Sequence, residues 1–123
     1  MKLQTLSIVI FFFFVFLVFY AETICPVASE LYWLDHFFFG IGFPWLLAYL
    51  PVLFSQSWAK FSFKKGVCLT AILSLLNEYI ADVIDNETWV FLEQIVHTVA
   101  DFFGILCAIS LFLVLTKCLG VKA

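Results

Sequence analysis

Charged residues divide the 123-residue chain into long uncharged stretches that are mostly apolar. A helix that crosses a bilayer needs about 20 predominantly apolar residues, because each residue advances the helix by about 1.5 Å. Two stretches reach this length alone, and two more reach it if a few ionisable residues enter the membrane. The pattern therefore predicts an all-α integral membrane four-helix bundle, a single domain over residues 1–123. The predicted spans are about residues 3–21, 36–55, 64–82 and 93–116.

The first two segments each allow a second interpretation. Lys2 followed by an apolar core is also typical of a cleaved secretory signal, although Phe19 stands where a small residue is preferred before cleavage. Pro44 and Pro51 would permit a kinked or re-entrant second segment. A re-entrant segment would place lysines on both sides of the membrane, which disfavours it.

The composition excludes two broad classes of protein. Hydrophobic residues make up 65% of the chain and charged residues 12%, whereas a water-soluble domain carries roughly a quarter charged residues. The chain has no Arg and a net charge of -3, so it lacks the basic patch that contacts phosphates in nucleic acids. We therefore expect the lipid bilayer as a partner, and no nucleic acid.

The lysines predict the direction of insertion. With four crossings, all six Lys fall on one side of the membrane, and the acidic loops at about residues 21–35 and 82–92 fall on the other. Cytoplasmic loops carry an excess of Lys and Arg. We expect both termini in the cytoplasm, and the cell membrane, specifically the bacterial cytoplasmic membrane, as the location of a multi-pass protein.

The cysteines do not form a recognisable framework. Cys25, Cys68, Cys107 and Cys118 have no CxxC spacing and fall mostly within apolar runs, so neither a disulfide set nor a zinc ribbon is predicted. We interpret them as small packing residues, of which only Cys25 would meet an oxidising compartment.

Ionisable residues inside the predicted spans are the strongest functional signal. Glu93, His97 and Asp101 recur every four residues and so share one helix face, which cannot face lipid. Glu78 lies in the third span, and His36 opens the second. We predict that His36, Glu78, His97 and Asp101 converge in the outer half of the bundle.

This residue set suits two kinds of chemistry. Imidazole and carboxylate ligands without thiolates suit a divalent metal ion, which is the one candidate cofactor that the sequence offers. The same groups suit proton exchange, because an imidazole titrates near neutral pH. His97, one turn before Asp101, is the expected partner of its carboxylate. A buried His–Asp pair can also simply hold helices together. Asp35 is either a member of the site or a cap of the second span.

Three short segments resemble the VanZ-like and YjdF-like small membrane proteins of bacteria: LDHFFFGIGF, LLNEYIADVID and HTVADFFGILCAI, which lie between residues 34 and 110. The resemblance implies a multi-span envelope protein without a settled biochemical activity, in which His36, Glu78, Asp101 and Gly104 match recurrent positions. This chain lacks the Arg usual before the final Asp and the Asn common after it.

Three functions remain open at this point. The first is a small envelope membrane protein whose acid and His cluster binds a cation or lipid head group near the outer leaflet. The second is a metal-dependent hydrolase of a lipid-linked envelope precursor, with His97 and Asp101 as ligands and Glu78 as general base. The third is a structural subunit, paired with another copy or with a membrane partner. Because no nucleophile is recognisable, we favour the first.

Overall fold

The computed structural model describes residues 3–24, 33–48, 62–81, 84 and 91–121. All regular secondary structure in these ranges is helical. The elements are α1 (Leu3–Ile24), α2 (Trp33–Leu47), α4 (Phe63–Leu76) with its π-helical continuation η2 (Asn77–Ala81), and α6 (Phe91–Leu113) with its π-helical continuation η3 (Val114–Cys118). The predicted all-helical architecture with four long helices is therefore confirmed for the described part of the chain.

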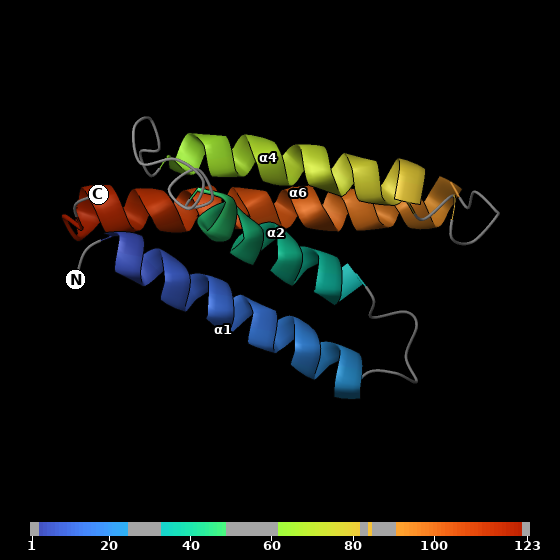
Figure 1. The fold of residues 1–123 in the computed structure, drawn as a ribbon, viewed down its shortest axis with the longest axis horizontal. Helices are drawn as coiled ribbons and strands as arrows, with labels where there is room; N and C mark the ends of the chain where they lie inside the picture. The colour runs from blue at the N-terminus through green and yellow to red at the C-terminus, as the bar shows by residue number, and fades with distance from the viewer. Residues whose placement is uncertain (1–2, 25–32, 49–61, 82–83, 85–90, 122–123) are drawn as a thin grey trace.

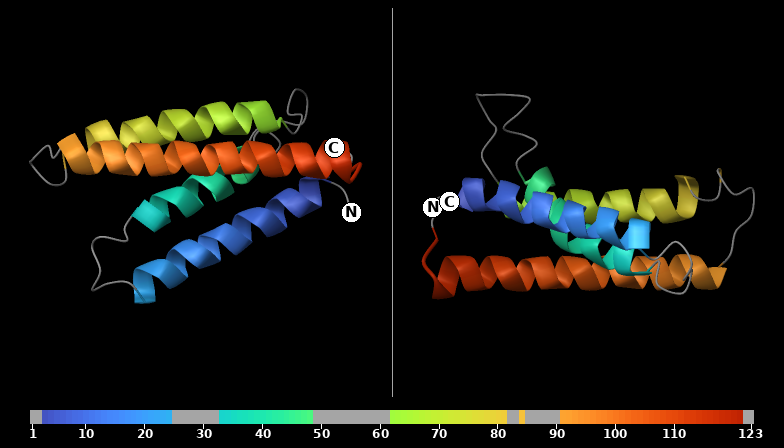
Figure 2. Two further views of the ribbon diagram at one scale, coloured as in Figure 1. Left: turned by 180° about the vertical axis from the view of Figure 1, so that it is seen from behind. Right: turned by 90° about the horizontal axis from the view of Figure 1, so that it is seen from below.

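Successive helices run in alternating directions, so that the start of α1 and the end of η3 lie at the same end of the bundle (Figure 1). Helix α2 is central, since it packs against α1, α4 and α6. We call the end that carries Lys64 and Lys117 the lysine end. We call the opposite end, which carries Glu22 and Asp35, the acidic end. Helix α1 runs alongside α2 and diverges from α4 and α6 towards the acidic end (Figures 1 and 2).

The helix bounds agree with three of the predicted spans. Helix α1 covers the span predicted at 3–21, α4 with η2 covers most of 64–82, and α6 with η3 covers 93–116. Helix α2 begins before the span predicted at 36–55 and ends at Leu47, and residues 49–55 lie outside the described ranges. Two segments, Leu3–Thr23 and Leu92–Cys118, are long and apolar enough to cross a membrane.

Many apolar side chains are exposed and several polar side chains are buried, which is the opposite of the distribution in water-soluble proteins. Large apolar side chains are exposed on every helix, for example Phe16 at 62%, Ile72 at 53% and Phe103 at 61%. Several polar side chains are instead buried: Ser7, Thr70, Ser74, Glu78, Gln94 and Asp101. Because exposed apolar surface on this scale is costly in water, this arrangement is typical of a bundle whose solvent is lipid.

An aromatic core closes the lysine end. Trp45 of α2, Phe63 of α4 and Phe112 of α6 pack together, with the Phe63 and Phe112 rings stacked at 4.3 Å between centroids. Leu3 brings the first turn of α1 into the same core. The Ser7 hydroxyl donates a 2.8 Å hydrogen bond to the carbonyl of Trp45 in the last turn of α2. This core anchors α1 at one end only.

Two glycines set the distance between α2 and α6. A Cβ atom on Gly40 would overlap the backbone carbonyl of Asp101, and a Cβ on Gly104 would overlap the carbonyl of Phe37. Small residues allow helices to approach this closely, which is a common solution where no water drives helix association. Gly40 lies one turn after His36, and Gly104 lies one turn after Asp101, so the close approach also brings these two polar residues together.

Candidate metal centre

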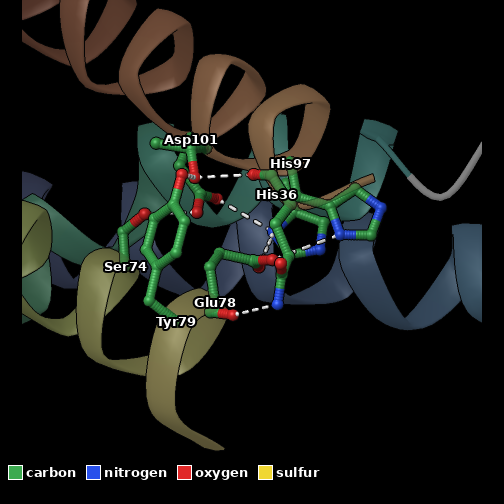
Figure 3. Close-up of polar contacts among 8 residues, drawn as sticks. His36, Ser74, Glu78, Tyr79, His97 and Asp101 are labelled. Atoms are coloured by element: carbon green, nitrogen blue, oxygen red, sulfur yellow. Dashed lines mark hydrogen bonds and ion pairs between the residues drawn. The ribbon is translucent and has the colours of Figure 1, made fainter. Parts of the chain in front are cut away.

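The structure brings together all four residues predicted for the site. His36 comes from α2, Glu78 from η2, and His97 and Asp101 from α6 (Figure 3). His36 Nδ1 lies 3.1 Å from Glu78 Oε1 and 3.2 Å from Asp101 Oδ1, and His97 Nδ1 lies 3.3 Å from Glu78 Oε2. The convergence predicted from helical spacing is therefore confirmed.

Local structure in the third helix places Glu78 in this cluster. Gly66, Thr70, Ser74 and Glu78 recur every four residues and are all buried, whereas the rest of that helix is largely exposed. The helix widens into a π turn at Asn77, just before Glu78. Such wide turns shift the register of the side chains that follow, and they occur frequently at functional sites.

The partners of Asp101 differ from the expected ones. Spacing suggested His97, one turn earlier on the same helix, as the partner of this carboxylate. In the structure Ser74 Oγ donates a short hydrogen bond to Asp101 Oδ2, and His36 Nδ1 approaches Oδ1. His97 turns instead towards Glu78. Asp101 of α6 thus makes its contacts with neighbouring helices and not along its own helix. Through His36 it contacts α2, and through Ser74 it contacts α4.

Glu78 is the centre of the cluster and its least satisfied member. Its side chain is fully buried, and neither carboxylate oxygen accepts a hydrogen bond from the described residues. Each oxygen nevertheless faces an imidazole nitrogen, at 3.1 Å for His36 and 3.3 Å for His97. Buried acceptors without a donor are rare, because a buried acceptor that makes no hydrogen bond costs about 1–3 kcal/mol. A cation held between this carboxylate and the two imidazoles would supply the missing partner.

The two imidazole rings constrain where positive charge can sit. His36 and His97 stack nearly parallel, with ring centroids 4.1 Å apart and an interplanar angle of 14°. Two imidazolium ions in this position would repel each other. With both imidazoles neutral and both carboxylates ionised, the cluster would carry two negative charges, which a bound divalent cation would balance.

Several residues around the cluster were not singled out from the sequence. Gln94 is buried and donates through Nε2 to the Glu78 carbonyl at 2.9 Å, and the Thr98 hydroxyl lies 3.1 Å from that of Tyr79. The spacing from Gln94 to His97 and on to Asp101 was a signal that could have identified Gln94, because three- and four-residue steps follow one helix face.

The expected position of Glu93 is wrong. It was predicted to share the buried face with His97 and Asp101, but its side chain is exposed. Four-residue steps advance about 400° around a helix of 3.6 residues per turn, so a long stripe drifts off a straight interface. Gln94, one residue later, takes the buried position.

Asp35 lies at the rim of the cluster and does not cap its helix. Helix α2 begins at Trp33, so Asp35 is in the first turn, where its charge suits the helix dipole. It precedes the predicted span, and burial raises the pKa of its carboxyl, the charge of Glu22 raises that pKa further, and His36 lowers it. Asp82, Asp85, Glu87 and Cys25 lie outside the described ranges.

The donor set fits a divalent metal ion that accepts nitrogen and oxygen ligands. His36, Glu78 and His97 each offer one ligand atom, and these three atoms lie within 4.8 Å of one another. Around a tetrahedral zinc ion, with metal–ligand distances of about 2.0–2.1 Å, neighbouring ligand atoms are about 3.3 Å apart. The separations of 3.1 Å from His36 to Oε1 of Glu78 and of 3.3 Å from His97 to Oε2 are close to that value, and a set with a single Glu78 oxygen stays within 4.8 Å.

The cysteines do not compete for this position. Cys68, Cys107 and Cys118 are free thiols, and none belongs to the group of potential ligands that the described residues form.

No protein-family model, curated protein or solved structure matches this chain.

Proposed function

We propose that the chain is a multi-pass protein of the bacterial cytoplasmic membrane, of VanZ-like type, with both termini in the cytoplasm. Two helices with the length and apolarity of membrane spans, and the apolar exposed surface of all the helices, support this proposal. The separation of the lysine end from the acidic end supports the direction of insertion, because lysines mark the cytoplasmic side.

Cysteine labelling in intact cells tests this topology. In a background without the native cysteines, a membrane-impermeant thiol reagent should modify Glu87→Cys and leave Ser62→Cys unmodified until the cells are lysed. The two positions lie in loops on opposite sides of the predicted membrane. Modification of Ser62→Cys alone would indicate the opposite orientation in the membrane. Modification of both variants in intact cells would contradict the four-span arrangement.

We propose that the protein binds a divalent metal ion through His36, Glu78 and His97. The observation that carries this proposal is the fully buried Glu78 carboxylate, whose two oxygens accept no hydrogen bond from the residues that the structure describes and each face an imidazole nitrogen. A divalent ion would balance the charge of Glu78 and Asp101 while both imidazoles stay neutral, which is the state in which imidazole binds metals.

In this proposal Asp101 positions His36. Its carboxylate is held by Ser74 and lies 3.2 Å from Nδ1 of His36. This is the same ring nitrogen that faces Glu78, so Asp101 lies directly beside the ligand set, and the loss of such a neighbouring carboxylate typically lowers metal affinity by about 10–100-fold. Asp101 is also the residue that links the cluster to α4.

The other two predicted functions remain predictions. A hydrolase would need a general base, but Glu78 lies among the potential ligand atoms and Asp101 is held by Ser74, so the cluster offers no free base among the described residues. A structural subunit would need the same residues to pair with another helix, whereas they pair within this bundle. Binding is therefore the function that the geometry supports best.

A thermal-shift experiment in detergent tests metal binding by this donor set. We expect Zn²⁺ or Co²⁺ at 100 times its Kd to stabilise the protein by about 2.7 kcal/mol, with reversal by a chelator. Mg²⁺ should have little effect, because it prefers oxygen ligands and retains its water shell. Equal stabilisation by all three ions would indicate binding to surface carboxylates and would contradict the proposal.

A further inference from the structure

A cleft of about 730 Å³ lies beside the cluster, between α1, α2 and α4 with η2. Its walls are mainly apolar, and its polar lining includes His36, Ser74 and Asp101, so it reaches the outer face of the metal centre. The volume is in the range of ligand-binding pockets, which are about 300–1,000 Å³. The apolar wall residues are Val18, Phe39, Leu73, Leu76, Ile80 and Ala81.

The surroundings of the cleft indicate where its occupant comes from. Helix α1 is anchored at the lysine end and diverges towards the acidic end, where Val18 and Glu22 line the cleft (Figure 2). The neighbouring surfaces of α1 and α4 are apolar, with Phe19 exposed at 67% and Ile80 at 52%. In a membrane these surfaces contact lipid, so an acyl chain can enter from the side.

The charge of the cleft is one-sided. Glu22, Asp35 and Asp101 contribute carboxylates, and no Lys is among the described residues that line the cleft. Lys64, Lys65 and Lys117, the lysines in the described part of the chain, belong to the lysine end. Glu22 and Asp35 both line the cleft, and after burial the charge of Glu22 raises the pKa of the Asp35 carboxyl. An anionic head group would be repelled here, whereas an ammonium group placed between these two carboxylates would be attracted.

We infer that this cleft binds a membrane lipid with an amine head group, whose ammonium lies between Glu22 and Asp35 and whose acyl chain lies against Phe39, Leu73 and Ile80. The inference rests on the proposed membrane location but does not require the metal. The cleft would thus bring a lipid head group to the edge of the cluster.

Native mass spectrometry of the full chain in detergent with a chelator present tests this inference. The protein is offered phosphatidylethanolamine and phosphatidylglycerol with identical acyl chains. We expect apparent affinity to be at least about tenfold higher for phosphatidylethanolamine, since one carboxylate–ammonium pair in a partly buried site can supply that difference. Equal retention of the two lipids by the wild-type protein, or preference for phosphatidylglycerol, would overturn the inference without any variant.

Two variants and a control locate the binding. The double variant Glu22→Gln, Asp35→Asn should bring the two affinities within about twofold of each other, because only the charge is removed. Leu73→Trp should reduce retention of both lipids by filling the cleft. Glu93→Gln, which removes an exposed acid outside the cleft, should retain the wild-type preference. An unchanged preference in the double variant would contradict the placement of the ammonium group.

The outcome of the lipid experiment is independent of the outcome of the metal experiment. Because a chelator is present in the lipid experiment, failure of lipid binding leaves the thermal shift with Zn²⁺ unaffected. Failure of metal binding likewise leaves the lipid preference unaffected.

Discussion

Replacing Glu78 by Gln is expected to lower the affinity of the protein for Zn²⁺ by at least about 100-fold, more than the loss of an outer residue around a metal site. Gln has the same shape as Glu, so the bundle should keep its packing. Its amide, however, is neutral and turns one donor group towards an imidazole nitrogen. Isothermal titration in detergent measures the effect.

Glu93→Gln is the matched control for this change. Glu93 lies on α6 near the same end of the bundle, but its side chain is exposed and it is not among the potential ligands. The same chemical change at this position should alter Zn²⁺ affinity by less than about threefold, as expected for a screened surface charge. Equal losses for the two variants would show that general negative charge, and not this cluster, attracts the ion.

Gly104→Ala is expected to destabilise the bundle by about 1–3 kcal/mol, the usual cost of forcing extra volume into a packed interface. The added Cβ would overlap the Phe37 carbonyl and come within 2.9 Å of the Gly40 Cα atom. These are backbone atoms, so α2 and α6 must move apart. His36 lies on α2 and His97 on α6, so Zn²⁺ affinity should fall as well.

Ser110→Thr provides the control for Gly104→Ala. It adds one methyl group to α6 at an exposed position. Its thermal unfolding midpoint should stay close to that of the wild-type protein, whereas the midpoint of Gly104→Ala should fall clearly. If Gly104→Ala were as stable as Ser110→Thr, the close approach of the two helices would not limit this structure.

The helices themselves were largely predictable from the sequence, because uncharged stretches report span length directly. The positions of the helix ends were less predictable. Helix α2 begins at Trp33, before the predicted start at 36, so Asp35 falls inside its first turn. Hydropathy is averaged over a window and cannot fix such a boundary. The π turn at Asn77 was also hidden, because it depends on packing around Glu78.

The members of the site were predictable, but their pairing was not. An ionisable residue within an apolar span is costly unless it finds a partner, and this principle alone identified His36, Glu78, His97 and Asp101. Which residues pair depends on helix rotation and crossing distance, which are set by contacts such as Gly40 against Gly104. The sequence therefore suggested His97 for Asp101, whereas the structure pairs Asp101 with His36 and Ser74.

X-ray absorption spectroscopy of the purified protein loaded with one equivalent of Zn²⁺ tests the central claim most directly. We predict a first coordination shell of nitrogen and oxygen at about 2.0–2.1 Å, with the multiple-scattering pattern of two imidazoles, and no sulfur. In Glu78→Gln this signal should be lost or replaced. A shell containing sulfur at about 2.3 Å, or no protein-bound zinc after dialysis, would contradict a metal site at His36, Glu78 and His97.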